Sequence, residues 1–120
     1  MAHEVNIGDD GILRMAFIGG MDEEDTKAFR EEFDPILKSA TEAEPLRILV
    51  DGSRSGKYTS AARRIFVELQ RSPLIGDVAL VGASRYSRVL AGFVLKATGR
   101  DNVRLFESEE EALGWLRGRG

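Results

Sequence analysis

The sequence LRILVDGSRSGKYTSAARRIFVELQRSPLIGDVALV, residues 46–81, predicts a strand, a helix and a second strand. Its two ends, residues 46–50 and 77–81, are short and nearly continuous apolar runs, which suit strands buried on both faces of a parallel sheet. Four apolar residues between them recur at the spacing of one helix face: Ala62, Ile65, Phe66 and Leu69. The stretch therefore predicts a βαβ unit, in which a right-handed crossover packs the helix against the sheet.

A hairpin and a helix are predicted before this unit. Residues 4–7 and 12–18 flank a polar turn, Asp-Asp-Gly at residues 9–11, and such turns join antiparallel strands. Asp22 is suited to cap a helix whose first turn is acidic. Pro35 has no N–H group to donate, so we expect this helix to kink or end there.

Helix and strand patterns continue to the end of the chain. Residues 86–97 carry a wide apolar helix stripe, which we expect to pack in the core, although its surplus width could also line a lipid pocket or a dimer face. Gly99 is a natural stop. Residues 103–106 predict another strand, and Ser108 begins a capping box before the last helix. The predicted fold is α/β, in the order β-β-α-β-α-β-α-β-α, with a mixed, mostly parallel sheet of about five strands and an antiparallel edge hairpin. Because 120 residues are too few for two cores, we expect residues 1–120 to form a single domain.

The composition excludes several classes of site. The chain has no Cys, and His3 is its single His, which excludes disulfides, thiolate metal sites and most His-based catalysis. We therefore expect no metal and no cofactor. No apolar run approaches the roughly 18 residues that a membrane span needs, and the N-terminus has no secretory pattern, so we expect a soluble, cytoplasmic protein without a transmembrane segment.

Positive charge is concentrated in the middle of an acidic chain. The net charge is −3, yet residues 54–100 hold nine Lys and Arg residues against only Glu68 and Asp77. Such a cluster attracts a phosphate, an anionic lipid head group or an acidic protein partner, although long cationic side chains also simply solvate helix faces. The acidic total and the lack of interleaved aromatic residues argue against nucleic acid as a partner.

Polar residues follow both buried strands, at the point where each strand ends. In open α/β sheets, ligands gather outside the carboxyl ends of the strands. If the two strands are neighbours, their loops share one edge of the sheet, and we expect a ligand site there. The candidate ligand-binding residues are Asp51, Ser53, Arg54, Lys57, Ser84, Arg85 and Arg88.

The sequences of these loops partly match two catalytic motifs, but neither motif is complete. Residues 52–57 (GSRSGK) have three residues between the glycines, where a P-loop has four, and Tyr58 follows the Lys. Ser84 lies in a sequence that lacks the second glycine of an esterase elbow, and we expect it to cap the next helix. Strand-terminal Asp51 commonly only fastens a loop. A small hydrolase that uses Asp51 and Ser84 is kept as the alternative, and we predict no catalytic residues.

Three segments resemble a known family. Residues 46–53 (LRILVDGS), 77–84 (DVALVGAS) and 103–116 (VRLFESEEEALGWL) together are similar to SpoIIAA-like proteins, which are STAS/Sec14-type domains. The closing segment has the strand-terminal Phe, the acidic turn and the Glu-Ala-x-x-Trp-Leu pattern of that family. The likeness covers essentially the whole chain, and it implies a mixed sheet with an edge hairpin and a non-enzymatic role.

The wider relatives imply two functions. In anti-sigma-factor antagonists a serine at a helix start is phosphorylated, and the equivalent count from Asp51 falls on Ser60, although Thr59, Ala61 and Ala62 replace the surrounding motif. CRAL-TRIO relatives hold lipids, which here would lie beside residues 86–97.

We therefore predict a non-catalytic regulatory or ligand-binding module. It would bind a protein partner or a small anionic amphiphile or lipid, and its size and its relatives suggest a homodimer. The alternatives are the hydrolase with Asp51 and Ser84 and a phosphorylation switch at Ser60. A helix cap is the simpler role for Ser60.

Overall fold

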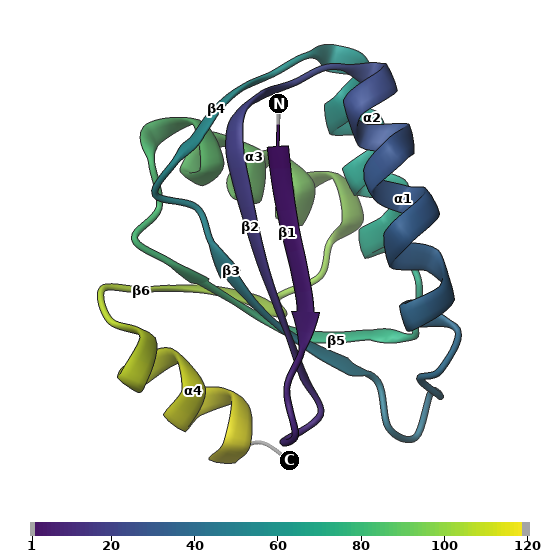
Figure 1. Cartoon of the computed structure of the whole chain (residues 1–120), viewed down its shortest axis with the longest axis vertical. Helices are drawn as coiled ribbons and strands as arrows, with labels where there is room; N and C mark the ends of the chain where they lie inside the picture. Colours follow the sequence, from purple (N-terminus) through teal and green to yellow (C-terminus); the bar gives the residue numbers. More distant parts are fainter. Residues whose placement is uncertain (1, 119–120) are drawn as a thin grey trace.

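The computed structural model describes residues 2–118 and contains a mixed sheet with four helices (Figure 1). The elements in chain order are β1 (Ala2–Ile7), β2 (Ile12–Met21), α1 (Glu23–Leu37), β3 (Leu46–Asp51), β4 (Ser55–Tyr58), α2 (Ser60–Gln70), β5 (Ile75–Val81), α3 (Arg85–Thr98), β6 (Val103–Phe106) and α4 (Glu109–Gly118). None of the helices in the described range is long and apolar enough to cross a membrane.

The sheet has the predicted mixed topology. The strand order is β1-β2-β3-β5-β6, in which β1 pairs antiparallel with β2 and the remaining pairs are parallel. The predicted fold class, the edge hairpin and the two neighbouring central strands are therefore confirmed. The helix over residues 60–70 connects β3 and β5, as the βαβ pattern predicts.

One strand was not predicted. Residues 55–58, for which the sequence predicts no strand, are β4, which pairs with the end of β2. Its sequence, Ser-Gly-Lys-Tyr, has neither the length nor the apolar alternation that indicates a strand. Glycines permit the pairing, because a Cβ on Gly20 would lie 2.9 Å from the Lys57 carbonyl oxygen and one on Gly56 would lie 2.9 Å from the Gly20 nitrogen. The sequence pattern of one segment does not indicate that its backbone will lie close to the backbone of another strand.

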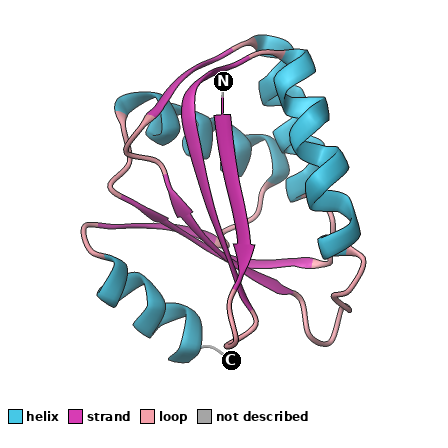
Figure 2. Ribbon diagram, viewed as in Figure 1, coloured by secondary structure: helices cyan, strands magenta, loops and turns pink. Residues whose placement is uncertain are grey.

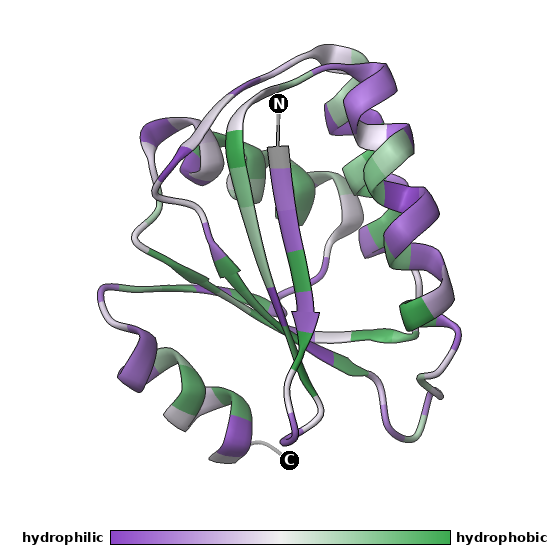
Figure 3. Ribbon diagram, in the orientation of Figure 1, coloured by the Kyte–Doolittle hydropathy of each residue, from purple (hydrophilic) through white to green (hydrophobic). Residues whose placement is uncertain are grey.

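The helices cover the two faces unequally. Helices α1, α2 and α3 lie on one face, and α4 lies alone on the other (Figure 2). Neighbouring residues of β3 alternate between these layers: Ile48 and Val50 enter the larger core, whereas Leu49 joins the smaller core under α4. The outer sides of α1 and α2 are largely hydrophilic, and the central strands are largely hydrophobic (Figure 3). The central strands are thus buried on both faces, as predicted.

The helix boundaries follow the predicted capping residues with two exceptions. Asp22 caps α1 in a reciprocal capping box with Asp25, and Gly99 ends α3 in the left-handed conformation, with φ 70°. Pro35 does not end α1, which continues to Leu37, because a proline in the last turn removes only one hydrogen bond. Ser60 does not cap α2: Thr59 does, and Ser60 is the first helical residue.

Candidate functional site

The loops that follow β3 and β5 lie against each other. In the parallel pair β3/β5, Asp51 is opposite Val81. Just beyond it the Gly52 N–H donates to the Val81 carbonyl at 3.1 Å, and the Ser84 N–H donates to the Gly52 carbonyl at 3.0 Å. The two loops therefore share one edge of the sheet, as the sequence predicted. We call residues 52–54 and 82–84, with the first residues of α2 and α3, the loop edge.

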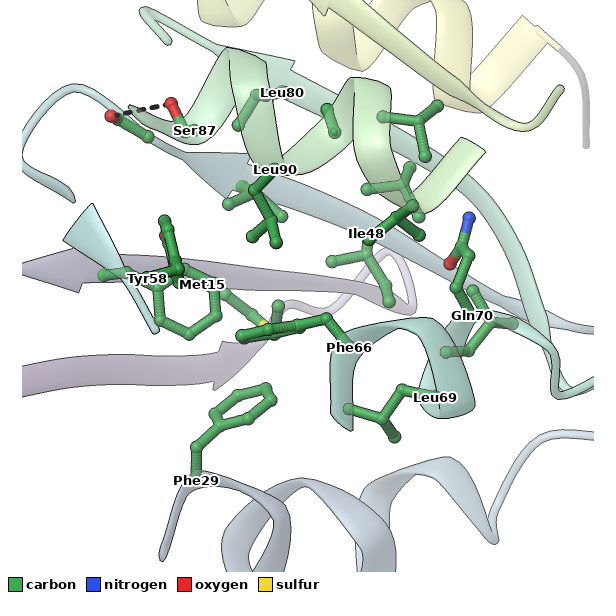
Figure 4. Close-up of a pocket in the computed structure, with 18 of the residues that line it drawn as sticks. Met15, Phe29, Ile48, Tyr58, Phe66, Leu69, Gln70, Leu80, Ser87 and Leu90 are labelled. Carbon is green, nitrogen blue, oxygen red and sulfur yellow. Dashed lines mark hydrogen bonds between the residues drawn. The ribbon is translucent and has the colours of Figure 1, made fainter. Parts of the chain in front are cut away.

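Serine hydroxyls tie the two loops together. Ser84 Oγ donates to the Ser55 carbonyl at 3.0 Å and accepts from the Ser87 N–H at 3.2 Å. Ser87 Oγ lies 3.2 Å from the Gly52 carbonyl oxygen (Figure 4). Ser84 is thus the N-cap of α3, as predicted, and a structural link to the loop below it.

Asp51 fastens its own loop. Its Oδ1 accepts from the Ser53 N–H at 2.9 Å and from the Ser53 hydroxyl at 2.7 Å, and the Arg54 guanidinium lies 3.8 Å from Oδ2. Partial burial opposes ionisation, but the two bonds from Ser53 and the charge of Arg54 outweigh it and lower the pKa of Asp51. Asp51 is therefore a carboxylate at neutral pH, and its Oδ1 is engaged by Ser53.

A catalytic serine would need a base, and none of the described contacts supplies one. No ionisable side chain in residues 2–118 is hydrogen-bonded to Ser84 Oγ. His3 is bonded instead to Glu32 of α1 at 2.6 Å and packs on Phe29. The geometry gives the hydrolase alternative no support.

The predicted ligand-binding residues divide between two hollows. Asp51, Ser53 and Arg54 line a hollow of about 430 Å³ on the α4 face of the sheet, beside residues of both charges: Glu4, Arg14 and Glu109. Lys57 and Arg85 line a second hollow of about 300 Å³ beside the N-terminal halves of α2 and α3. The predicted site is therefore not one ligand pocket. Ser84 is half-buried and lines neither hollow, and Arg88 donates to the Ala83 carbonyl without lining either.

The second hollow is cationic, and we call it the cationic hollow. It is lined by Lys57, Tyr58, Arg63, Arg85, Tyr86, Val89 and Leu90. Arg85 donates to the Tyr86 hydroxyl at 3.0 Å and stacks over its ring at 4.9 Å. This hydrogen bond, with the nearby charges of Arg85 and Lys57, lowers the pKa of Tyr86. In the part of the chain that the structure describes, no carboxylate lies within ion-pair distance of Lys57, Arg63 or Arg85.

The apolar stripe of residues 86–97 is only partly buried. Val94 is in the core, but Tyr86, Val89 and Phe93 keep 36%, 62% and 42% of their surface exposed. The stripe is wider than the contact that α3 makes with the sheet and α2. Its side next to α2 therefore stays open to solvent, where the pattern alone had predicted a core.

The cavity under α3 is small. It has a volume of about 120 Å³ and is lined mostly by apolar side chains of the sheet and of α1, α2 and α3 (Figure 4). A dry cavity of roughly 150 Å³ accepts a molecule the size of benzene, whereas ligand pockets span roughly 300–1,000 Å³. An acyl chain does not fit, and the predicted lipid site gains no support.

Ser60 is exposed at the start of α2. Its Oγ accepts a hydrogen bond from Arg63 Nη2 at 3.1 Å. Its neighbour Thr59 accepts the N–H of Ala62 and so performs the capping role. The Ser60 hydroxyl is therefore free of a capping role and faces a guanidinium group.

Comparison with known proteins identifies the fold. A family model described as a domain of unknown function, DUF7793, matches residues 9–119. A search of curated proteins gives no significant match. Among solved structures, an uncharacterised DUF3478 protein with a SpoIIAA-like fold from Shewanella loihica has a TM-score of 0.72 and 18% identity, covering 96% of this chain and 92% of its own.

Two structures of the protein SpoIIAA are also similar. The anti-sigma factor antagonist SpoIIAA in its unphosphorylated form has a TM-score of 0.69 and 18% identity, over 98% of this chain and 99% of its own. The phosphorylated form of SpoIIAA from Bacillus has a TM-score of 0.68 and 17% identity, over 97% of this chain and 100% of its own. The resemblance that the sequence predicts is confirmed at the level of the fold.

Proposed function

We propose that this chain, which belongs to the family described as a domain of unknown function, DUF7793, is a regulatory module that binds a protein partner through its loop edge and catalyses no reaction. The observation that carries the proposal is the state of the polar groups at that edge and directly beside it. Ser84 and Asp51 are engaged by their own loops, whereas Lys57 in the adjoining strand β4 and Arg85 at the start of α3 are without carboxylate partners among the described residues. Unpaired cations of this kind can bind acidic groups of a partner. A catalytic serine would instead need a neighbouring base to activate it.

The similar structures support a regulatory role. The similar SpoIIAA structure in the unphosphorylated form is that of an anti-sigma factor antagonist, and the fold is shared over nearly the whole length of both chains. A small anionic amphiphile is the competing ligand, and native mass spectrometry of freshly purified protein detects it as an added mass. The sequence also predicts one domain over residues 1–120, a cytoplasmic location and self-association, and we keep these as proposals.

A capture experiment tests partner binding. The wild-type protein and the variant Lys57→Glu/Arg85→Glu are immobilised, and proteins retained from a lysate of the source organism are quantified. Lys38→Glu/Arg71→Glu is the matched control, because it makes the same charge change at exposed residues away from the loop edge. We expect a protein retained by the wild type and the control to be lost from the loop-edge variant. Retention by all three would contradict the proposal.

Phosphorylation of Ser60 is the second candidate function. It is favoured by the exposed hydroxyl at a helix N-terminus beside Arg63. A phosphate there adds about −1.5 to −2 charges next to a helix dipole and a guanidinium that both stabilise it. It would neutralise part of the cationic hollow and so change which partner binds.

Intact mass measurement tests the switch. The protein is co-expressed with candidate serine kinases of the source organism, and Ser60→Ala is the control. An added phosphate that disappears in Ser60→Ala supports the switch. An unmodified wild-type chain under every kinase would end it.

A further inference from the structure

The cationic hollow continues into an exposed apolar stripe. Phe93 lies one helical turn from Val89 and is covered on one side by the Arg63 guanidinium, 5.3 Å from the ring centroid. We call this continuous surface the α2–α3 groove. Its members are Lys57, Arg63, Arg85, Tyr86, Val89 and Phe93.

Arg63 has unused hydrogen-bonding capacity in this groove. Its Nη2 donates to Ser60, but its Nε is buried and has no partner, the single such side-chain atom in residues 2–118. A buried donor without an acceptor destabilises the folded state. A carboxylate that approaches the guanidinium from the groove pairs with its accessible N–H groups, because two parallel hydrogen bonds fit the geometry of both groups.

The apolar side chains give the groove a direction. Tyr86, Val89 and Phe93 are spaced so that they follow one side of α3, and seven residues of helix rise by about 10 Å. Val89 is exposed over 62% of its surface. A small anion would occupy only the end near Arg85 and leave Val89 and Phe93 in water. An elongated ligand with alternating acidic and apolar groups covers the whole stripe.

We propose that the α2–α3 groove binds an acidic, amphipathic peptide segment of the protein partner. Its carboxylates would meet Lys57, Arg63 and Arg85, and its apolar side chains would cover Val89 and Phe93. The proposal rests on the proposed function and adds the place and the chemistry of the contact. Charge complementarity is its main support, since the groove lies in the basic middle of an otherwise acidic chain.

A membrane surface fits the groove less well. Peripheral membrane helices present a convex apolar face flanked by cations, whereas here the cations line a hollow of about 300 Å³ between two elements. The acidic residues of the first sixty positions, thirteen against seven Lys and Arg, also repel an anionic bilayer.

Selection from a peptide library tests the inference with defined probes. Random twelve-residue peptides displayed on phage are selected on the wild-type protein, and recovered peptides are synthesised and their affinities measured by fluorescence anisotropy. We expect at least two acidic residues beside aromatic or aliphatic ones. We also expect binding to weaken about tenfold or more in Arg63→Gln and in Phe93→Ala, and to weaken as salt rises.

Arg64→Gln is the matched control, because Arg64 is the exposed neighbour of Arg63 outside the groove. Circular dichroism confirms that each variant is folded. Selected peptides without acidic residues, no enrichment at all, or equal binding to Arg63→Gln, Phe93→Ala and wild type would each overturn the inference.

Two further probes separate the remaining ligands. Binding to phosphatidylglycerol vesicles that is lost in Phe93→Ala, without peptide binding, assigns the groove to a membrane and overturns the peptide. If the protein binds inorganic phosphate but no peptide, the groove is assigned to a small anion, and the peptide proposal is overturned. If the lysate capture succeeds while peptide selection fails, the partner binds Lys57 and Arg85 without a peptide segment in the groove, so the two proposals fail separately.

Discussion

Gly52 determines how closely the loop edge packs. A Cβ at this position would lie 2.7 Å from Ser87 Oγ and 2.8 Å from Leu80 Cδ1. We expect Gly52→Ala to lower the free energy of unfolding by about 1–3 kcal/mol, because the loop and α3 must separate to admit a methyl group. Urea unfolding measures the change.

The double variant Gly52→Ala/Ser87→Ala is the control for this clash. Removing the Ser87 hydroxyl relieves one of the two short contacts, so the double variant should lose less stability than the sum of the single variants. Strict additivity would show that the two residues do not interact in the way the structure indicates.

Asp10 joins the first hairpin to the last helix. Its carboxylate accepts from Arg14 at 3.1 Å, from Arg117 at 2.8 Å and from the Ile12 N–H at 3.1 Å. The bonds from Arg14 and Arg117 hold the pKa of Asp10 far below its usual range. A carboxyl with a lowered folded pKa stabilises the protein above its unfolded pKa of about 3.9, and that contribution is lost as the pH falls towards the folded value.

Replacing this carboxylate should therefore have a pH-dependent effect. We expect Asp10→Asn to lower the free energy of unfolding by about 1–2 kcal/mol at pH 7 and by progressively less below about pH 4. Asp9→Asn, at the exposed neighbour, should have little effect at either pH. A loss in Asp10→Asn that is the same at pH 3 and pH 7 would show that the charge is not the source of the stability.

The sequence predicted the role of a single residue correctly where that role depends only on its neighbours along the chain. Asp22, Ser84 and Gly99 cap helices as expected, because capping depends on a few adjacent residues. The role of Arg63 depends on Ser60 within its own helix and on Phe93 from another helix. A local sequence pattern cannot indicate that Arg63 contacts residues of two different helices.

Two glycines, Gly92 inside helix α3 and Gly99 at its C-terminal cap, have opposite roles. Gly99 ends the helix with φ 70°, whereas Gly92 lies inside it, and a Cβ on either residue would meet nothing within 4 Å. Gly99→Ala should destabilise by about 1 kcal/mol, since an L-residue is strained in the left-handed region. Gly92→Ala should stabilise by about 0.5–1 kcal/mol, because alanine favours the helix interior. Thermal unfolding of both variants measures the difference, and a shift of the same sign in both would refute this assignment.

Helices and strands were predictable where the regular spacing of apolar residues extended over enough positions. The strands β3 and β5 and the helices followed from their spacing, but β4 is four residues of mixed polarity held by backbone pairing with β2. The exposed half of the α3 stripe was mistaken for core for a related reason. Periodicity gives the width of an apolar face, and only the neighbouring elements decide how much of it is covered.

At the scale of the whole molecule, the order of the strands determines the site. The sequence predicted that the loops after β3 and β5 meet, and they do. It did not predict that the sheet itself separates their side chains, so that Asp51 and Arg54 face the α4 side while Lys57 and Arg85 face α2 and α3. That division follows from β4, which redirects the chain after Arg54.

Site-specific photo-crosslinking in cells of the source organism tests the central claim most directly. Benzoylphenylalanine is placed at Val89 in the α2–α3 groove or at Leu105 on β6, two apolar residues with 62% and 45% of their surface exposed. We predict a crosslinked protein from position 89 that is absent from position 105 and is lost when Arg63→Gln is added. Crosslinking from position 105 alone, or from both positions equally and regardless of Arg63→Gln, would contradict the account.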